Sequence, residues 1–129
     1  MTVKPGHILV VDDHKTNRMK MSFALRKLGH TVDLAENGRQ ALDILRAQSF
    51  DLVLLDLIMP EMDGYQVLEQ MKNDAALRTI PVILVTAEQE TESVAKGIEL
   101  GADDYLPKAF DSVLLETRVG ACLEKKTVP

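Results

Sequence analysis

The sequence predicts a doubly wound α/β fold, with five parallel strands in the order 2-1-3-4-5 and helices on both faces of the sheet. Short apolar runs alternate five times with longer stretches of helical periodicity along the 129 residues. Strict alternation of strands and helices indicates a parallel sheet joined by right-handed crossovers. The first, third and fourth runs are continuously apolar, whereas the second alternates and the fifth is short. We therefore expect the continuous runs at the centre of the sheet and the other two at its edges.

The five predicted strands are short, and turn or cap residues bound them. They cover residues 7–11, 31–35, 52–55, 81–85 and 104–106. The run 52–55 is typical of a strand buried on both faces, and Pro60 prevents it from continuing regularly. The alternation of polar and apolar residues in 31–35 indicates an edge strand with one wetter face.

The helices are predicted from their caps and from apolar stripes with a period near 3.6. They cover about 14–28, the stretches that follow Asn37 and Asp63, about 89–100, and a stretch from Asp111 to about 125. Asn37, Asp63 and Asp111 are suited to cap helix N-termini, because their side-chain oxygens accept backbone N–H groups. Gly29 and Gly101 follow the first and fourth helices, where a left-handed residue commonly ends a helix.

Length and composition indicate one domain over residues 1–129, with a core of 7–125 and a tail or start of a linker at 126–129. The net charge of −5 argues against a nucleic-acid surface. The single cysteine, Cys122, excludes an internal disulfide and fits a reducing compartment. No run approaches the roughly 20 apolar residues of a membrane span. We therefore predict a cytoplasmic protein that contacts neither membrane nor nucleic acid.

Polar residues stand at the carboxyl ends of four predicted strands. Asp12 and Asp13 follow the first strand, Asp56 the third and Thr86 the fourth, and Lys108 comes just after the fifth. In a doubly wound sheet these ends meet near the switch point between strands one and three, where ligands bind. Each residue alone has an ordinary structural interpretation, as a helix cap or a solvated turn residue. Their convergence at one edge favours a functional site.

Three neighbouring carboxylates repel one another, so the predicted cluster needs a cation. Oxygen ligands with no histidine or cysteine expected nearby indicate a hard divalent ion, and Mg²⁺ fits this ligand set. Lys108 adds a positive charge and Thr86 a hydroxyl donor. A metal, an ammonium and a hydroxyl around one nucleophilic carboxylate, Asp56, suit acceptance of a phosphoryl group as an acyl phosphate.

These residues lie in motifs that resemble the receiver domain of a bacterial two-component response regulator, over essentially the whole chain. The motifs are Val10-Val11-Asp12-Asp13 and the stretches 54–64, 85–87 and 101–108. The resemblance implies a flavodoxin-like (βα)5 fold with Asp56 as phosphoacceptor. It implies that Asp13, Asp56 and the backbone carbonyl of Ile58 hold Mg²⁺ directly, and that Asp12 acts mainly through a water on the metal.

The resemblance also assigns a switch. Thr86 is then the hydroxyl that follows the phosphoryl group, Tyr105 the aromatic that turns inward with it, and Lys108 the cation that binds phosphate. The implied donor is a phosphohistidine on a sensor histidine kinase or a histidine phosphotransfer protein. The implied output is a changed surface on the fourth helix, fifth strand and fifth helix, with a possible homodimer there. Such a domain signals, and catalyses only its own phosphotransfer and dephosphorylation.

Three features are particular to this chain. Ala109 follows Lys108 where the family usually has a proline after a cis peptide, and we expect the cis bond to persist so that the ammonium reaches the phosphoryl oxygens. Met19 and Phe23, four residues apart on the first helix, face away from its apolar stripe and form a predicted docking patch for the donor.

Ile58 and Glu88 lie two residues after Asp56 and Thr86, and an apolar residue at 58 predicts slow self-dephosphorylation.

Other interpretations remain open from the sequence. A phosphatase of the aspartate-nucleophile kind needs a second aspartate two residues after the nucleophile, where this chain has Ile58. A flavin module needs a hydroxyl- and glycine-rich loop after strand one, where residues 12–15 are Asp-Asp-His-Lys. A pseudo-receiver that only binds partners would follow if Ala109 disabled the site.

Two further features carry expectations of their own. His7, His14 and His30 are interpreted as structural or exposed. The ending at 123–126 favours a receiver excised from a longer protein.

Overall fold

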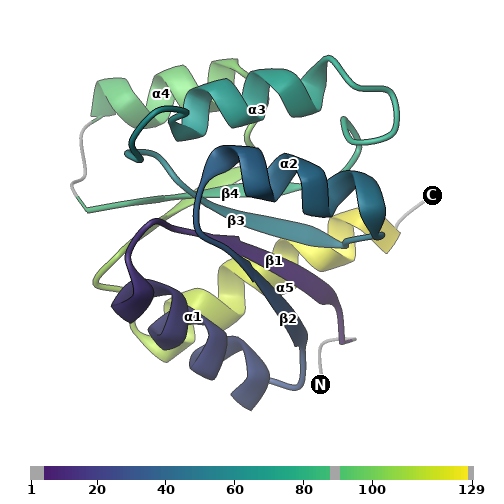
Figure 1. Cartoon of the computed structure of the whole chain (residues 1–129). Coiled ribbons are helices and arrows are strands. Elements are labelled where there is room, and N and C mark those ends of the chain that lie inside the picture. The colour runs from purple at the N-terminus through teal and green to yellow at the C-terminus, as the bar shows by residue number, and fades with distance from the viewer. Residues whose placement is uncertain (1–4, 88–90, 128–129) are drawn as a thin grey trace.

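The computed structural model describes residues 5–87 and 91–127, which form a parallel sheet between two layers of helices (Figure 1). The five strands are β1 (His7–Val11), β2 (Thr31–Ala35), β3 (Leu52–Asp56), β4 (Val82–Thr86) and β5 (Asp104–Pro107). They pair in parallel in the order β2-β1-β3-β4-β5, which confirms the predicted topology.

The helices are α1 (Lys15–Lys27), α2 (Gly38–Ala47), α3 (Gly64–Lys72), α4 (Thr91–Glu99) and α5 (Ser112–Thr127). In Figure 1, α1 and α5 lie on one face of the sheet, and α2, α3 and α4 lie on the other. Successive strand residues point to opposite faces. Ile8 and Val10 therefore pack with the inner residues of α1 and α5, while Leu9 and Val11 pack with those of α2 and α3. Burial on both faces explains why the central strands are continuously apolar.

The helix termini match the predicted caps. The side chains of Asn37 and Asp63 accept the N–H groups of the residues three positions later, at 2.8 Å and 3.0 Å. Asp111 accepts the N–H of Leu114 at 2.7 Å. Gly29 and Gly101 have positive φ angles of 98° and 112°, as expected for residues that end helices. The predicted start of the fourth helix at 89 lies outside the described residues.

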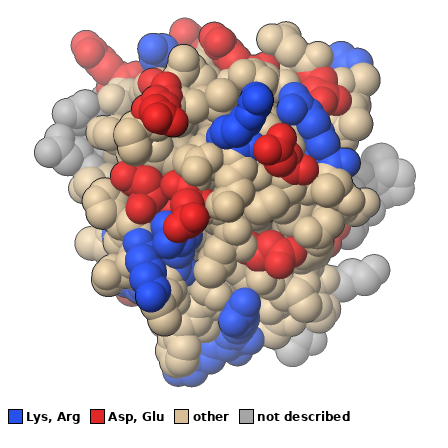
Figure 2. Space-filling model, viewed as in Figure 1, with Lys and Arg blue, Asp and Glu red and all other residues tan. Residues whose placement is uncertain are grey.

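The strand register brings the carboxyl ends to one level. Val11 pairs with Leu55, so Asp12 and Asp56 follow at the same height, and Thr86 pairs with Pro107 just before Lys108. On the face shown in Figure 2, lysines and arginines are interspersed with acidic side chains and do not form a continuous stripe. Within residues 5–87 and 91–127, no helix has the length and apolar character that a bilayer span requires.

Candidate functional site

Three aspartates form the centre of the candidate site at the carboxyl edge of the sheet. Asp12 follows β1 and is fully buried, Asp56 ends β3 and is 1% exposed, and the Asp13 side chain is 22% exposed. One oxygen of each, namely Asp12 Oδ2, Asp13 Oδ1 and Asp56 Oδ2, is buried without a hydrogen-bond partner among the described residues. Buried carboxylate oxygens without partners are costly. Their clustering therefore favours a bound cation.

Lys108 connects two of these carboxylates. Its Nζ lies 3.2 Å from Asp56 Oδ1 and 3.7 Å from Asp12 Oδ2. Its backbone N–H donates to the carbonyl of Thr86 at 2.8 Å, so β4 holds the start of the loop that carries the ammonium. The structure thus brings the side chains of Asp12, Asp56 and Lys108 together from three strand ends, and the backbone of Thr86 at the fourth strand end contacts Lys108.

The carboxyl group of Asp56 has an unusual proton affinity. Burial, followed by the negative charge of Asp12, raises the pKa of Asp56 to a net value of about 6. The charge of Lys108, its hydrogen bond to Asp56 and the N–H of Ile58 lower the pKa in opposition. At neutral pH the group is therefore ionised, but it is more basic than an exposed aspartate.

The expected cis peptide between Lys108 and Ala109 is wrong. Both residues are described, and no peptide bond in the described residues is cis. A cis bond before a non-proline residue costs about 2.5–4 kcal/mol. The ammonium of Lys108 reaches Asp56 with the trans peptide, so nothing in this arrangement requires that cost.

The expectation that no histidine lies nearby is also wrong. His14 Nδ1 lies 3.2 Å from Asp13 Oδ1 and 3.6 Å from Asp12 Oδ1. The backbone N–H of His14 donates to Asp12 Oδ1 at 2.9 Å. Its position next to Asp13 was the signal that could have found it, because a residue adjacent to a strand-end aspartate must lie at the same edge.

Arg18 is a second residue near the site that the sequence pattern did not predict. It is 8% exposed, its guanidinium donates to the backbone carbonyl of Asp12 at 2.8 Å, and it lies 3.5 Å from Glu36. Arg18 stands three residues before Met21 and seven before Leu25, on the buried stripe of α1. A charged residue on an apolar stripe was therefore the available signal. Arg18 fixes the backbone that presents the first carboxylate.

The other predicted site residues lie on β5, on α1 and in the loop after β3. Tyr105 is half-buried in β5, and the Arg118 guanidinium lies 4.7 Å from the centre of its ring. Ile58 donates its N–H to Asp56 Oδ1 at 3.4 Å, and it is 78% exposed. Met19 and Phe23 are 58% and 70% exposed on α1. The prediction for Glu88 lies outside the described residues.

The residues present fit a divalent cation. Ligand atoms of Asp12, Asp13 and His14 lie within 4.8 Å of one another. One oxygen each of Asp12, Asp13 and Asp56 is buried without a hydrogen-bond partner among the described residues. Carboxylate oxygens are the ligands that Mg²⁺ prefers, whereas an imidazole would also suit a transition metal.

A model of the response regulator receiver domain matches residues 8–120. The chain belongs to this family. It is 42% identical over 119 residues to protein PilH of Pseudomonas aeruginosa, covering 92% of this chain and 98% of PilH. It is 39% identical to a probable transcriptional regulator, ycf27 of Cyanidium caldarium, covering 92% of this chain but only 47% of that protein. The chain thus spans about half the length of some relatives that it matches.

A solved structure supports the same assignment. The signal receiver domain of a signal transduction histidine kinase from Syntrophus aciditrophicus superposes with a TM-score of 0.87 at 35% identity. The match covers 96% of this chain and 94% of that one. The protein is therefore a receiver domain of the two-component type, with the flavodoxin-like fold that the sequence predicted.

Proposed function

We propose that this receiver domain accepts a phosphoryl group onto Asp56 from a phosphohistidine of a sensor kinase or phosphotransfer protein. The observation that supports this most is the setting of Asp56. It is a buried carboxylate that contacts an ammonium on one oxygen and lacks a hydrogen-bond partner among the described residues on the other. Asp13, Asp56 and the carbonyl of Ile58 would hold Mg²⁺, with Asp12 close by.

In the proposed transfer, an Asp56 oxygen forms a bond to phosphorus as the bond from phosphorus to the imidazole nitrogen breaks. The electron pair of that bond returns to the ring, which then takes up a proton. The ammonium of Lys108, 3.2 Å from Asp56, is placed to stabilise charge on the transferred oxygens. A bound Mg²⁺ would supply further neutralisation of that charge. A pKa of about 6 keeps the Asp56 nucleophile ionised at neutral pH.

The proposed output begins at Thr86. Its backbone carbonyl accepts the N–H of Lys108, so the two residues are linked. A phosphoryl group that attracts the Lys108 ammonium and the Thr86 hydroxyl would therefore move both residues together. Movement of Thr86 would leave room for Tyr105, which lies in the neighbouring strand β5. The two positions of Tyr105 would bias the surface of α4, β5 and α5, where a homodimer or another partner would bind.

The phosphoacceptor is tested by mass spectrometry of the intact protein after incubation with acetyl phosphate and Mg²⁺. We expect the wild type to gain one phosphoryl mass that hydroxylamine removes, as it does from acyl phosphates. Asp56→Asn should gain none. Asp43→Asn, on the exposed face of α2, is the matched control and should behave as the wild type. An unlabelled wild type, or a labelled Asp56→Asn, would refute the proposal.

The donor is proposed to dock on Met19 and Phe23. These apolar side chains are exposed on α1, the helix that begins directly after the acidic cluster. Changing both to serine should slow transfer from a phosphohistidine protein while leaving the reaction with acetyl phosphate unchanged. Ile98→Ser removes an apolar side chain of α4 that is 43% exposed, and serves as control. Equal loss with both donors would exclude a docking role.

A further inference from the structure

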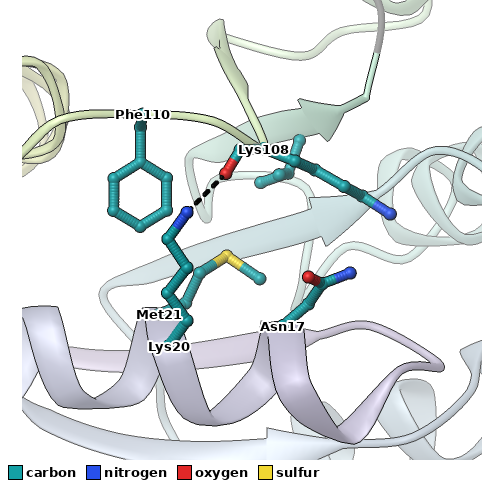
Figure 3. A pocket seen from close by; sticks show the side chains of 6 residues that line it. Asn17, Lys20, Met21, Lys108 and Phe110 are labelled. Atoms are coloured by element: carbon teal, nitrogen blue, oxygen red, sulfur yellow. Dashed lines mark hydrogen bonds between the residues drawn. The ribbon is translucent and has the colours of Figure 1, made fainter.

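We propose that Lys20 is a positioning residue for phosphotransfer, because it holds the backbone of Lys108 and so keeps that ammonium at Asp56. This inference rests on the proposed function. Lys20 extends from α1 to the loop after β5, and its Nζ donates to the backbone carbonyl of Lys108 at 3.0 Å (Figure 3). The same ammonium lies 4.7 Å from the centre of the Phe110 ring.

Lys20 and Lys108, which this hydrogen bond joins, both line a pocket between α1 and the loop after β5. The lining residues are Asn17, Lys20, Met21, Val85, Lys108 and Phe110. In Figure 3 the side chain of Lys108 extends away from Lys20, and only its carbonyl oxygen turns towards it. Lys20 therefore acts on the backbone of Lys108 and leaves its ammonium free to contact the carboxylates.

Lys108 is consequently held on both sides. Its N–H donates to the carbonyl of Thr86 in β4 at 2.8 Å, and its carbonyl accepts from Lys20 in α1 at 3.0 Å. The next residue, Ala109, is exposed and has no ring to restrict its backbone. The hydrogen bond from Lys20 thus supplies a restraint on the carboxyl side of Lys108 from a different element of the fold.

This restraint matters because the lysine side chain is flexible. Its ammonium stands on a four-carbon stem, and it must remain between Asp56 Oδ1 and Asp12 Oδ2. A misplacement of about 1 Å can cost orders of magnitude when a group must meet developing charge. Phe110 assists, because its ring face favours a cation at the position from which Lys20 donates.

The test is binding of trifluoroberyllate, a mimic of the phosphoryl group, at a fixed saturating concentration of Mg²⁺. Lys20→Met should weaken this binding about threefold to tenfold, as expected for loss of one hydrogen bond. Lys20→Arg should restore affinity to within about twofold, because a guanidinium can donate to the carbonyl and stack on Phe110. Lys27→Met removes the same charge from the last turn of α1 and should bind as the wild type.

A spectroscopic measurement separates contact from stability. The carbonyl ¹³C resonance of Lys108 should move upfield in Lys20→Met, and it should not move in Lys27→Met. Melting temperature and Mg²⁺ affinity should remain those of the wild type, because Lys20 is exposed.

Several results would overturn the inference. These are unchanged trifluoroberyllate affinity in Lys20→Met, an equal loss in Lys27→Met, failure of Lys20→Arg to recover, or a parallel loss of stability and Mg²⁺ affinity. A wild type that binds no trifluoroberyllate would remove the proposed function and this inference with it. A wild type that binds, with Lys20→Met unchanged, removes the inference alone.

Discussion

Polar side chains have different roles at the two edges of the sheet. At the amino edge, Asp51 accepts the N–H of His7 at 2.8 Å, Asp103 accepts that of Val82 at 2.9 Å, and His30 Nδ1 accepts that of Gly6 at 3.0 Å. At the carboxyl edge, three aspartate oxygens are buried without a hydrogen-bond partner among the described residues. The amino edge uses these groups to satisfy the backbone. At the carboxyl edge Asp12 and Asp56 also accept a backbone N–H, but each keeps a second buried oxygen available for a ligand.

The pKa shifts of His30, at the amino edge, and Asp56, at the carboxyl edge, have opposite effects on stability as pH falls. Burial lowers the pKa of His30 below its usual 6.5, so the folded state loses stability as pH falls below that value. Burial, followed by the charge of Asp12, raises the pKa of Asp56 to about 6. The folded state therefore binds a proton there more tightly than the unfolded state, and it gains stability as pH falls through 6 towards 3.8. Ionised Asp56 therefore lowers the free energy of unfolding at neutral pH, at the edge that carries the candidate site.

The largest expected effect is stabilisation of the carboxyl edge by Mg²⁺. An ion that binds only the folded state adds about 2.7 kcal/mol to the free energy of unfolding when it is present at 100 times its Kd. We expect this gain in the wild type and its near loss in Asp13→Asn, measured by urea unfolding with and without the ion. Asp103→Asn changes a carboxylate at the amino edge and should keep the full gain. An equal response in both variants would contradict the division between the edges.

The next largest effect is expected at the amino edge. His30→Ala leaves the buried N–H of Gly6 without its acceptor, and we expect it to lower the free energy of unfolding by about 2 kcal/mol at neutral pH. His14, 67% exposed at the other edge, is the matched control. His14→Ala should change the same quantity by less than about 0.5 kcal/mol. Similar losses in the two variants would remove the basis of the comparison.

A smaller effect, opposite in sign, is expected at Asp56. Without divalent ions, Asp56→Asn removes a negative charge that is buried and is repelled by the charge of Asp12. Lys108 compensates that charge only in part. At pH 7.5 we expect a gain on the order of 1–2 kcal/mol in the free energy of unfolding, allowing for solvent screening. The gain should vanish near pH 4, where Asp56 in the wild type is protonated. Urea unfolding across this pH range measures it, and a gain that persists at low pH would exclude the proposed cause.

The sequence predicted the fold well because each element had a local signal. The continuous apolar runs matched the central strands, and Asn37, Asp63 and Asp111 cap helices as expected. It predicted the site less completely, since side-chain contacts between separate elements have no such signal. Arg18 and Lys20 reach the backbone carbonyls of Asp12 and Lys108, and neither spacing nor composition shows which carbonyl a long side chain will meet.

The smallest expected effect concerns Ile58, whose side chain is 78% exposed beside Asp56. An apolar side chain cannot orient a water molecule for attack on an acyl phosphate, so we expect the phosphorylated wild type to persist far longer than seconds. Ile58→Asn supplies an amide that can position water, and it should accelerate hydrolysis about fivefold, which corresponds to about 1 kcal/mol. The measurement is the decay of the phosphoryl mass after the donor is removed. Ile98→Asn places the same amide on α4 and should leave the decay unchanged. A wild-type lifetime of seconds, or equal acceleration by both variants, would show that the side chain at 58 does not govern access of water to Asp56.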